Sequence, residues 1–179
     1  MTRKARIVSK GSIYHVLSRG NNKESIFNQE EDKEFFQQKL LFAKQKYKFK
    51  LLCFAIMPNH FHLLIQPSEQ ASLSTIMKSL LVSYSFYYNH KNNRVGHVFQ
   101  DRFKSYICLK DTYLVTLISY IHQNPKRAGL VNDSSEYKYS SLQTYLKKSK
   151  NNLVDKKFII EFLENSFGQK GTVLIKKIS

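Results

Sequence analysis

Two histidines separated by one residue are the first feature of the sequence with chemical meaning. They are His60 and His62, and they lie in the apolar run MPNHFHLLIQP at residues 57–67. If this run is a β-strand, both imidazoles point to one face, and Phe61 and Leu63 point to the other. Two neighbouring imidazoles can bind one divalent cation through ring nitrogens. They form only half of a metal site, because a third ligand, substrate oxygens or water must complete it.

The same pair is also compatible with two polar residues on a half-exposed strand. The chain has six histidines. The other four are scattered along the sequence, and we assign no role to them: His15, His90, His97 and His122.

The charge of the chain indicates a polyanionic partner. The 179 residues include 29 Lys and Arg against 13 Asp and Glu, a formal net charge of +16. Such an excess favours nucleic acid, with an anionic membrane surface as the second choice. Hydrophobic residues make up 42% of the chain, which is enough for the core of one domain.

Several features favour a cytoplasmic protein. Cys53 and Cys108 lie in apolar segments without a C-x-x-C spacing, so we expect reduced core residues. The basic N-terminal segment lacks the apolar stretch of a signal peptide. No apolar run approaches the roughly 20 residues that a membrane-spanning helix needs.

Hydrophobic periodicity predicts the strands and helices that must position the histidines. We expect strands at residues 12–20, 49–57 and 60–67, and a bent or interrupted strand within 96–109. We expect helices at residues 28–48, 72–91 and 110–125, a short one near 140–148 and a last one near 158–163. Asn28 is the expected N-cap of the first helix, Asp111 or Thr112 caps the third, and Pro125 stops it.

This order of elements predicts an α+β domain of the ferredoxin-like or RNA-recognition-like type. The central sheet should be mostly antiparallel, with the 49–57 and 60–67 strands forming a hairpin and the helices packed on the sheet. In the 110–125 helix, Tyr120 and Asn124 lie one turn apart, beside an apolar stripe. The residues alone also allow Tyr120 to be an ordinary amphipathic tyrosine at the margin of the core.

The chain resembles the HUH single-tyrosine transposases, and within them the REP-associated tyrosine transposase branch. The resemblance rests on the histidine pair, on RKARIVSKGSIYHVLSRGNNKESIF at residues 3–27 and on YLVTLISYIHQNPKRAGLV at residues 113–131. Two further segments add to the resemblance, GHVFQDRFKSYIC at residues 96–108 and YKYSSLQTY at residues 137–145. It covers residues 2–146 and therefore implies a transposase domain at 1–146 with a basic arm at 1–11. Residues 147–179 would form a linker, a small helix and a tail.

The resemblance implies a role for particular residues. His60 and His62 would bind Mg²⁺ or Mn²⁺, Asn124 would be a third metal ligand, and Tyr120 would be the nucleophile. The tyrosine would cleave single-stranded DNA through a 5′-phosphotyrosine intermediate and rejoin it, at hairpin-forming repeat sequences.

The partner implied is single-stranded or hairpin DNA rather than a membrane, with the protein associated with the nucleoid when bound. Its oligomeric state, monomer or homodimer, stays open. Phe99, Phe103 and Tyr106 are candidates for stacking on unpaired bases, although core packing is the expected role of most of them. Expected DNA contacts are Arg3, Lys4, Arg6, Arg19, Asn21, Arg102, Lys104, Lys126 and Arg127.

Two other function classes compete with this hypothesis. A non-catalytic nucleic-acid-binding module of RNA-recognition-like fold would explain the charge, but it would have no use for Tyr120 or the histidine pair. The histidine-triad nucleotide hydrolases carry H-x-H-x-H on a strand, whereas Leu64 stands in the third position here. That class is therefore disfavoured.

Overall fold

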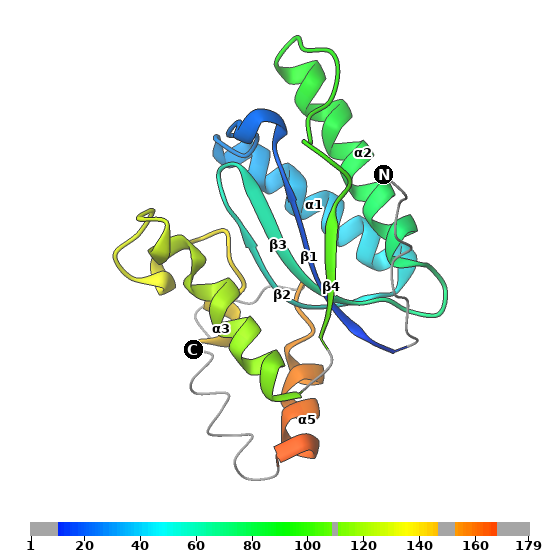
Figure 1. Ribbon diagram of the computed structural model, residues 1–179, viewed down its shortest axis with the longest axis vertical. Helices are drawn as coiled ribbons and strands as arrows, with labels where there is room; N and C mark the ends of the chain where they lie inside the picture. The colour runs from blue at the N-terminus through cyan, green and yellow to red at the C-terminus, as the bar shows by residue number, and fades with distance from the viewer. Residues whose placement is uncertain (1–10, 109–110, 147–152, 168–179) are drawn as a thin grey trace, which may run out of the picture.

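The computed structural model describes residues 11–108, 111–146 and 153–167, and Figure 1 shows their arrangement. The strands are β1 (Ile13–Arg19), β2 (Lys50–Ile56), β3 (His60–Gln66) and β4 (Lys104–Cys108). The α-helices are α1 (Glu30–Tyr47), α2 (Leu73–Lys91), α3 (Asp111–Arg127), α4 (Leu142–Tyr145) and α5 (Lys156–Phe167). Two 3-10 turns lie at Asn21–Lys23 and Ser134–Glu136.

The four strands form one sheet in the order β2-β3-β1-β4, and every neighbouring pair is antiparallel. Helix α1 connects β1 to β2, and α2 connects β3 to β4. This topology is the ferredoxin-like one, with β2 and β3 joined as a hairpin. It confirms the α+β fold and the mostly antiparallel sheet predicted from the sequence.

An aromatic core fills the side of the sheet that α1 and α2 cover (Figure 1). The ring of Phe61, on β3, packs 4.8 Å from Phe36 and 6.2 Å from Phe27, centroid to centroid. Tyr84, on α2, lies against the same two phenylalanines and donates a hydrogen bond to the Ile26 carbonyl. Phe61 therefore faces the core, as the alternation of β3 predicts.

Helix α3 covers the opposite face of the sheet (Figure 1). Its apolar stripe of Leu114, Leu117, Ile118 and Ile121 is buried, as the sequence predicts. The expected end of this helix near Pro125 is wrong, because α3 continues to Arg127 with Pro125 inside it. The backbone adjusts beyond the proline, where the Leu130 N–H donates to the Pro125 carbonyl at 3.0 Å.

Two other boundaries, the N-cap of α1 and the extent of the last helix, differ from the sequence prediction. The N-cap of α1 is Gln29 rather than Asn28, and its N–H donates to the Asp32 carboxylate at 3.1 Å. The 96–109 segment holds an interrupted strand, as expected, because Phe99 forms an isolated bridge with Gly20 and β4 spans Lys104–Cys108. The last helix is longer than expected, because it spans Lys156–Phe167.

The segment that carries α5 is attached to the edge of the sheet at β2. The Asp155 N–H donates to the Leu51 carbonyl at 2.8 Å, and the Asp155 carboxylate accepts from the Leu51 N–H at 2.8 Å. The same carboxylate pairs with Lys44 of α1 at 2.9 Å. Ile159, on α5, is fully buried. Within the described residues, no helix combines the length and apolar character that crossing a membrane requires.

Candidate active site

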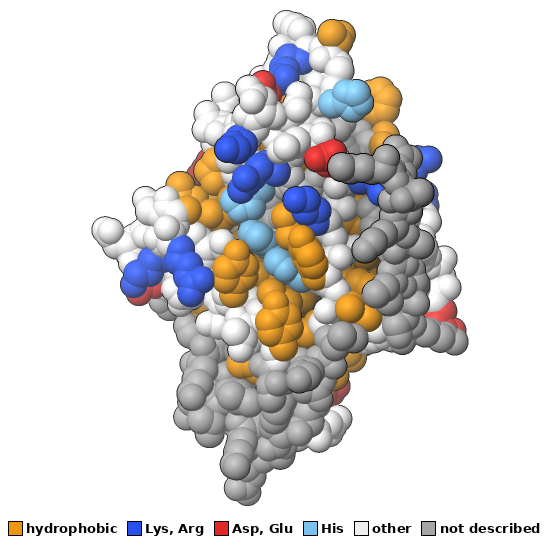
Figure 2. All heavy atoms as spheres, in the orientation of Figure 1, with side chains coloured by type: hydrophobic (Ala, Val, Ile, Leu, Met, Phe, Trp, Pro, Cys, Tyr) orange, Lys and Arg blue, Asp and Glu red, His pale blue; other side chains and the backbone are white. Residues whose placement is uncertain are grey.

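The register of β1 and β3 brings the histidine pair to the face that α3 covers. His62 pairs with Leu17, and His60 pairs with Arg19. On the same face of β1, His15 lies diagonally across from His62, because His15 pairs with Leu64, two residues further along β3. Figure 2 shows histidine side chains in a row at the centre of this face, surrounded by hydrophobic and cationic side chains.

The rings of His60 and His62 are close enough to act on one ligand. Their centroids are 4.9 Å apart and the rings are nearly perpendicular. Burial, and then the charge of Arg19, lowers the pKa of His60 to about 4. Burial, and then the neighbouring histidines and Arg19, lowers the pKa of His62 to about 3. Both imidazoles are therefore neutral at neutral pH, which is the form that binds a metal ion.

One nitrogen of His62 fits a metal ligand particularly well. The side chain of His62 is only 5% exposed, and its Nε2 atom is buried without a hydrogen-bond partner. Buried polar atoms are almost always paired in folded proteins. A cation at this point would give the Nε2 atom the partner that the protein does not supply.

His15 belongs to the site although the sequence analysis gave it no role. Its Nε2 atom lies 2.9 Å from the Nδ1 atom of His62, and the two ring planes are inclined by only 21°, with centroids 5.1 Å apart. Burial lowers the pKa of His15 to about 4, so this imidazole is also neutral. The signal in the sequence was the alternation of β1, which places His15 and Leu17 on one face. Finding it required the pairing of β1 with β3.

Tyr120 reaches the histidines from α3. Its ring meets His62 edge to face at 5.9 Å and His15 at 6.4 Å between centroids. Tyr120 is 39% exposed, so part of the residue is accessible to a large substrate. The guanidinium of Arg127 lies 5.5 Å from the centre of the Tyr120 ring. The structure therefore places the neutral imidazoles of His15 and His62 and the guanidinium of Arg127 around the Tyr120 ring.

Asn124 follows Tyr120 by one turn of α3 and is half-buried. Its side-chain amide donates to the Tyr120 carbonyl at 2.8 Å, which leaves the Oδ1 atom as the available ligand atom. Among the described residues, no group of three or more His, Cys, Asp or Glu side chains is placed to hold a metal ion. A cation held by the two histidines would therefore need further ligands from other groups, such as Asn124, substrate or water.

A basic cleft of about 310 Å³ opens at the end of β1. It gathers three of the predicted DNA-contacting residues, Arg19, Arg102 and Lys104, and adds Lys23, which the sequence analysis missed. Asp101 is the one acidic residue among those that line it. Arg19 connects this cleft to the histidines, because it pairs with His60 in the sheet.

The turn after Arg19 fixes the position of this cleft. The Gly20 N–H donates to the Asn59 carbonyl at 2.8 Å, and the Asn21 N–H donates to the Val98 carbonyl at 2.8 Å. A Cβ atom at Gly20 would collide with the Glu24 carbonyl oxygen and lie 2.9 Å from a methyl group of Ile26. Only glycine fits this close approach without a shift of the backbone.

The remaining predicted DNA contacts fall into three groups. Asn21 is exposed beside the basic cleft, and Lys126 and Arg127 are exposed at the end of α3. Arg3, Lys4 and Arg6 lie outside the described residues. Of the three aromatic candidates for base stacking, Phe99 and Phe103 are buried in the core, whereas Tyr106 is 57% exposed. Tyr106 lies next to His15, with ring centroids 6.3 Å apart.

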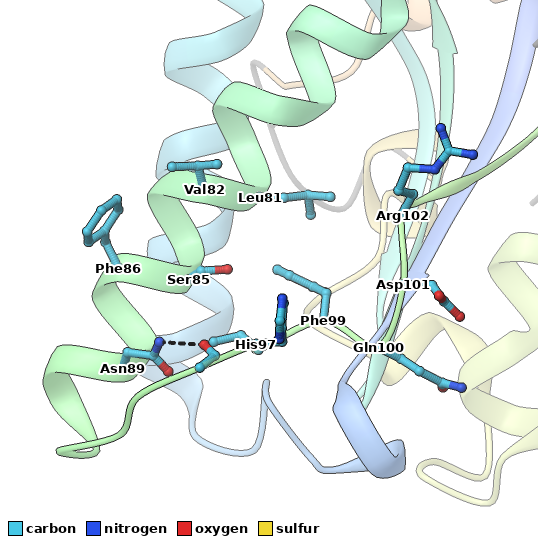
Figure 3. A pocket seen from close by; sticks show the side chains of 12 residues that line it. Leu81, Val82, Ser85, Phe86, Asn89, His97, Phe99, Gln100, Asp101 and Arg102 are labelled. Atoms are coloured by element: carbon cyan, nitrogen blue, oxygen red, sulfur yellow. Dashed lines mark hydrogen bonds between the residues drawn. The ribbon is translucent and has the colours of Figure 1, made fainter. Parts of the chain in front are cut away.

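An apolar groove of about 630 Å³ lies between α2 and residues 96–102 (Figure 3). Phe86 marks one end of it and Arg102 the other (Figure 3). Arg102, Gln100 and Asp101 line both this groove and the basic cleft. A hydrogen bond of 3.0 Å from the Asn89 amide to the Gly96 carbonyl ties the segment to α2.

A ferredoxin-like sheet that sets a histidine pair against a helical tyrosine is the arrangement that the sequence resemblance implies for HUH single-tyrosine transposases. Residues 8–124 match the model of the family described as Transposase IS200 like. The chain belongs to this family. The recognition made from the sequence is thereby confirmed.

The chain is also similar to two proteins described as REP-associated tyrosine transposases. A protein of Haemophilus influenzae provisionally named a REP-associated tyrosine transposase is 26% identical over 113 residues. The match covers 58% of this chain and 64% of the relative, so the chain spans less than two thirds of that protein. The solved structure of a REP-associated tyrosine transposase bound to a REP hairpin has a TM-score of 0.69 at 15% identity. The match covers 87% of this chain and 94% of the solved structure, and it supports the assignment of the fold.

Proposed function

We propose that this protein is a metal-dependent tyrosine transposase that cleaves and rejoins single-stranded DNA. The observation that carries this proposal is the contact between His62 and Tyr120, whose rings are 5.9 Å apart on the covered face of the sheet. A nucleophile and a metal-binding histidine must lie this close to act on one phosphodiester. We further propose that residues 1–146 are the transposase domain and that residues 147–179 are an appendage to it.

Tyr120 is the group that attacks the DNA. Its phenolic oxygen forms a bond to phosphorus, and the bond from phosphorus to the 3′ oxygen breaks. The phenol loses a proton and the departing 3′ oxygen gains one, so the step is balanced without a co-reactant. A phosphodiester linkage to tyrosine replaces the linkage to the 3′ oxygen. Because the bond energy is kept, the reverse reaction rejoins DNA without another energy source.

His60 and His62 hold the divalent cation in this proposal, with Asn124, DNA oxygens or water as further ligands. A bound Mg²⁺ or Mn²⁺ would polarise the phosphate and stabilise charge on the departing oxygen. The unpaired Nε2 atom of His62 supports this assignment. The mixture of imidazole and oxygen ligands suits Mn²⁺ somewhat better than Mg²⁺.

The cationic residues on both sides of Tyr120 bind the DNA backbone. Arg19, Arg102 and Lys104 line the cleft beside His60, while Lys126 and Arg127 lie at the end of α3. Tyr106, which is exposed beside His15, stacks on a base in this proposal. Because the solved relative is bound to a REP hairpin, we propose hairpin-forming repeats as the substrate and the nucleoid as the place of action.

Transfer of labelled DNA to the protein tests this function. A single-stranded hairpin oligonucleotide is incubated with the protein and Mn²⁺, and SDS-resistant adducts are counted. We expect an adduct with the label at the 3′ end of the DNA and a released fragment with the label at the 5′ end. Tyr120→Phe should abolish the adduct and keep DNA binding. Tyr113→Phe is the matched control, since Tyr113 is exposed on the same helix.

Two results would overturn the proposal. One is wild-type protein that binds the hairpin but gives no adduct with either label, as a non-catalytic nucleic-acid-binding module would. The other is Tyr120→Phe protein that gives as much adduct as wild type.

A further inference from the structure

Both histidines of the candidate metal site are held through the same ring nitrogen. The Nδ1 atom of His60 lies 2.6 Å from the side-chain oxygen of Asn59. The Nδ1 atom of His62 lies 2.9 Å from the Nε2 atom of His15. In each ring, Nε2 is thus the nitrogen left for a ligand. Whether Nε2 can bind a cation depends on which nitrogen of each ring carries the hydrogen, because a protonated nitrogen has no lone pair to offer.

The contacts of Asn59 decide this for His60. The Asn59 amide nitrogen donates to the Lys23 carbonyl at 3.3 Å, so its oxygen is the atom that faces His60. An amide oxygen can only accept a hydrogen bond. His60 must therefore carry its hydrogen on Nδ1, and its Nε2 atom has a free lone pair.

Two arrangements satisfy the bond between His15 and His62. If His15 donates, His62 carries its hydrogen on Nε2, and that N–H is buried without an acceptor. If His62 donates from Nδ1, its Nε2 atom has a lone pair instead. Buried N–H groups without a partner are rarer in proteins than buried acceptors without one. The second arrangement is also the only one in which Nε2 of the neutral ring can bind a cation.

We propose that His15 is a positioning residue of the metal site. Its Nε2 atom accepts the hydrogen bond from Nδ1 of His62 and so keeps the lone pair of His62 on Nε2. Asn59 does the same for His60. His15 is not a metal ligand through Nε2, since that atom is used by His62. The proposal rests on the metal-binding role of His60 and His62 in the proposed function.

Nuclear magnetic resonance of metal-free protein tests this directly, because ¹⁵N chemical shifts of histidine rings report which nitrogen carries the hydrogen. We expect the hydrogen of His62 on Nδ1 in the wild type. His15→Phe keeps a ring of similar size and removes the acceptor. In this variant neither ring nitrogen of His62 has an acceptor, so we expect the hydrogen to lose its preference for Nδ1 and to populate Nε2 as well, a form that cannot bind a cation through Nε2.

Mn²⁺ titration gives the second measurement, without DNA. His15→Phe should weaken Mn²⁺ binding by about 10–100-fold, as the loss of partners of metal ligands typically does. His15→Gln offers an amide oxygen in place of the imidazole nitrogen and should restore much of the affinity. His97→Phe is the matched control, since His97 is exposed and lies apart from the metal site on the groove of Figure 3.

The proposal is overturned if wild-type His62 carries its hydrogen on Nε2, or if His15→Phe binds Mn²⁺ as tightly as wild type. If His15→Phe does not fold, the wild-type ring spectrum and the His15→Gln titration still decide. These readouts use neither DNA nor cleavage. A protein that shows the predicted ring state and Mn²⁺ binding but no adduct would refute the proposed function and leave the role of His15 intact.

Discussion

The rings of Tyr120 and the buried His62 meet edge to face, with the ring centroids 5.9 Å apart and the planes at 82°. One residue comes from α3 and the other from β3. The contact spans the interface between the helix and the sheet, so the packing of α3 fixes the distance between the proposed nucleophile and the proposed metal ligand. Any change that shifts α3 on the sheet should therefore affect cleavage before it affects DNA binding.

Removal of the histidines should separate cleavage from DNA binding. His60→Ala and His62→Ala should both lose adduct formation, because the cation site is lost. Both should keep most hairpin affinity, since the phosphate contacts come from arginines and lysines. Cleavage and electrophoretic mobility assays on the same DNA measure the two effects. Loss of binding by a folded variant would show instead that the histidines contact DNA.

Residues of the basic cleft should contribute to binding through phosphate contacts. Removing Arg102 or Lys104 should lower the slope of log affinity against log salt by about 0.7–0.9 each. Lys78→Ala is the control, because Lys78 is exposed on α2 and does not line the cleft. Hairpin affinity measured at several salt concentrations gives the slopes. Equal slopes for all variants would mean that DNA does not pass through this cleft.

Gly20 should be intolerant of any side chain. Gly20→Ala forces a Cβ atom into the Glu24 carbonyl and the Ile26 methyl group. Such overpacking typically costs about 1–3 kcal/mol of unfolding free energy. Val95→Ala should change stability by less than about 0.5 kcal/mol, because Val95 is 95% exposed. Urea unfolding compares the two, and equal stabilities would contradict the tight turn.

Metal-free protein should lose stability as the pH falls through the ordinary range of histidine. Burial lowers the pKa of His15 and His60 to about 4 and contributes most to lowering that of His62 to about 3, whereas all three titrate near 6.5 when unfolded. Between pH 6.5 and 4 the unfolded chain therefore binds more protons, and acid favours it.

The His62→Asn variant tests this pH dependence. Between pH 6 and 4 its unfolding free energy should change less steeply than that of wild type, by at most about 1.4 kcal/mol per pH unit. Urea unfolding at several pH values in the presence of a chelator gives both curves. Parallel curves would show that the pKa of His62 is the same in the folded and the unfolded protein.

Asp155 should matter for stability and not for chemistry. Its carboxylate accepts from the Leu51 N–H and pairs with Lys44, so Asp155→Ala should cost about 1–3 kcal/mol. Adduct formation per folded molecule should stay unchanged if residues after 146 are an appendage to the catalytic domain. A parallel loss of adduct formation would place this segment within the domain.

The sequence by itself determined the local elements and half of the site. Alternation placed His60 and His62 on one face of a strand, and the stripe of α3 placed Tyr120 and Asn124 at its margin. These features depend on residues close in the chain, where backbone geometry fixes which side chains share a face. The same reasoning misplaced the end of α3, because packing onto the sheet outweighs the local preference of Pro125 to stop a helix.

Only the tertiary structure decided which side chains meet. His15 reaches His62 because β1 pairs with β3 in one register, and a slip by one residue would turn it to the other face. Lys23 enters the basic cleft because the Gly20 turn packs against Asn59 and Val98. Of the aromatic residues near the basic segments, Phe99 and Phe103 are buried in the core, whereas Tyr106 is 57% exposed. Strand register and burial are set by contacts between distant segments, which local patterns do not specify.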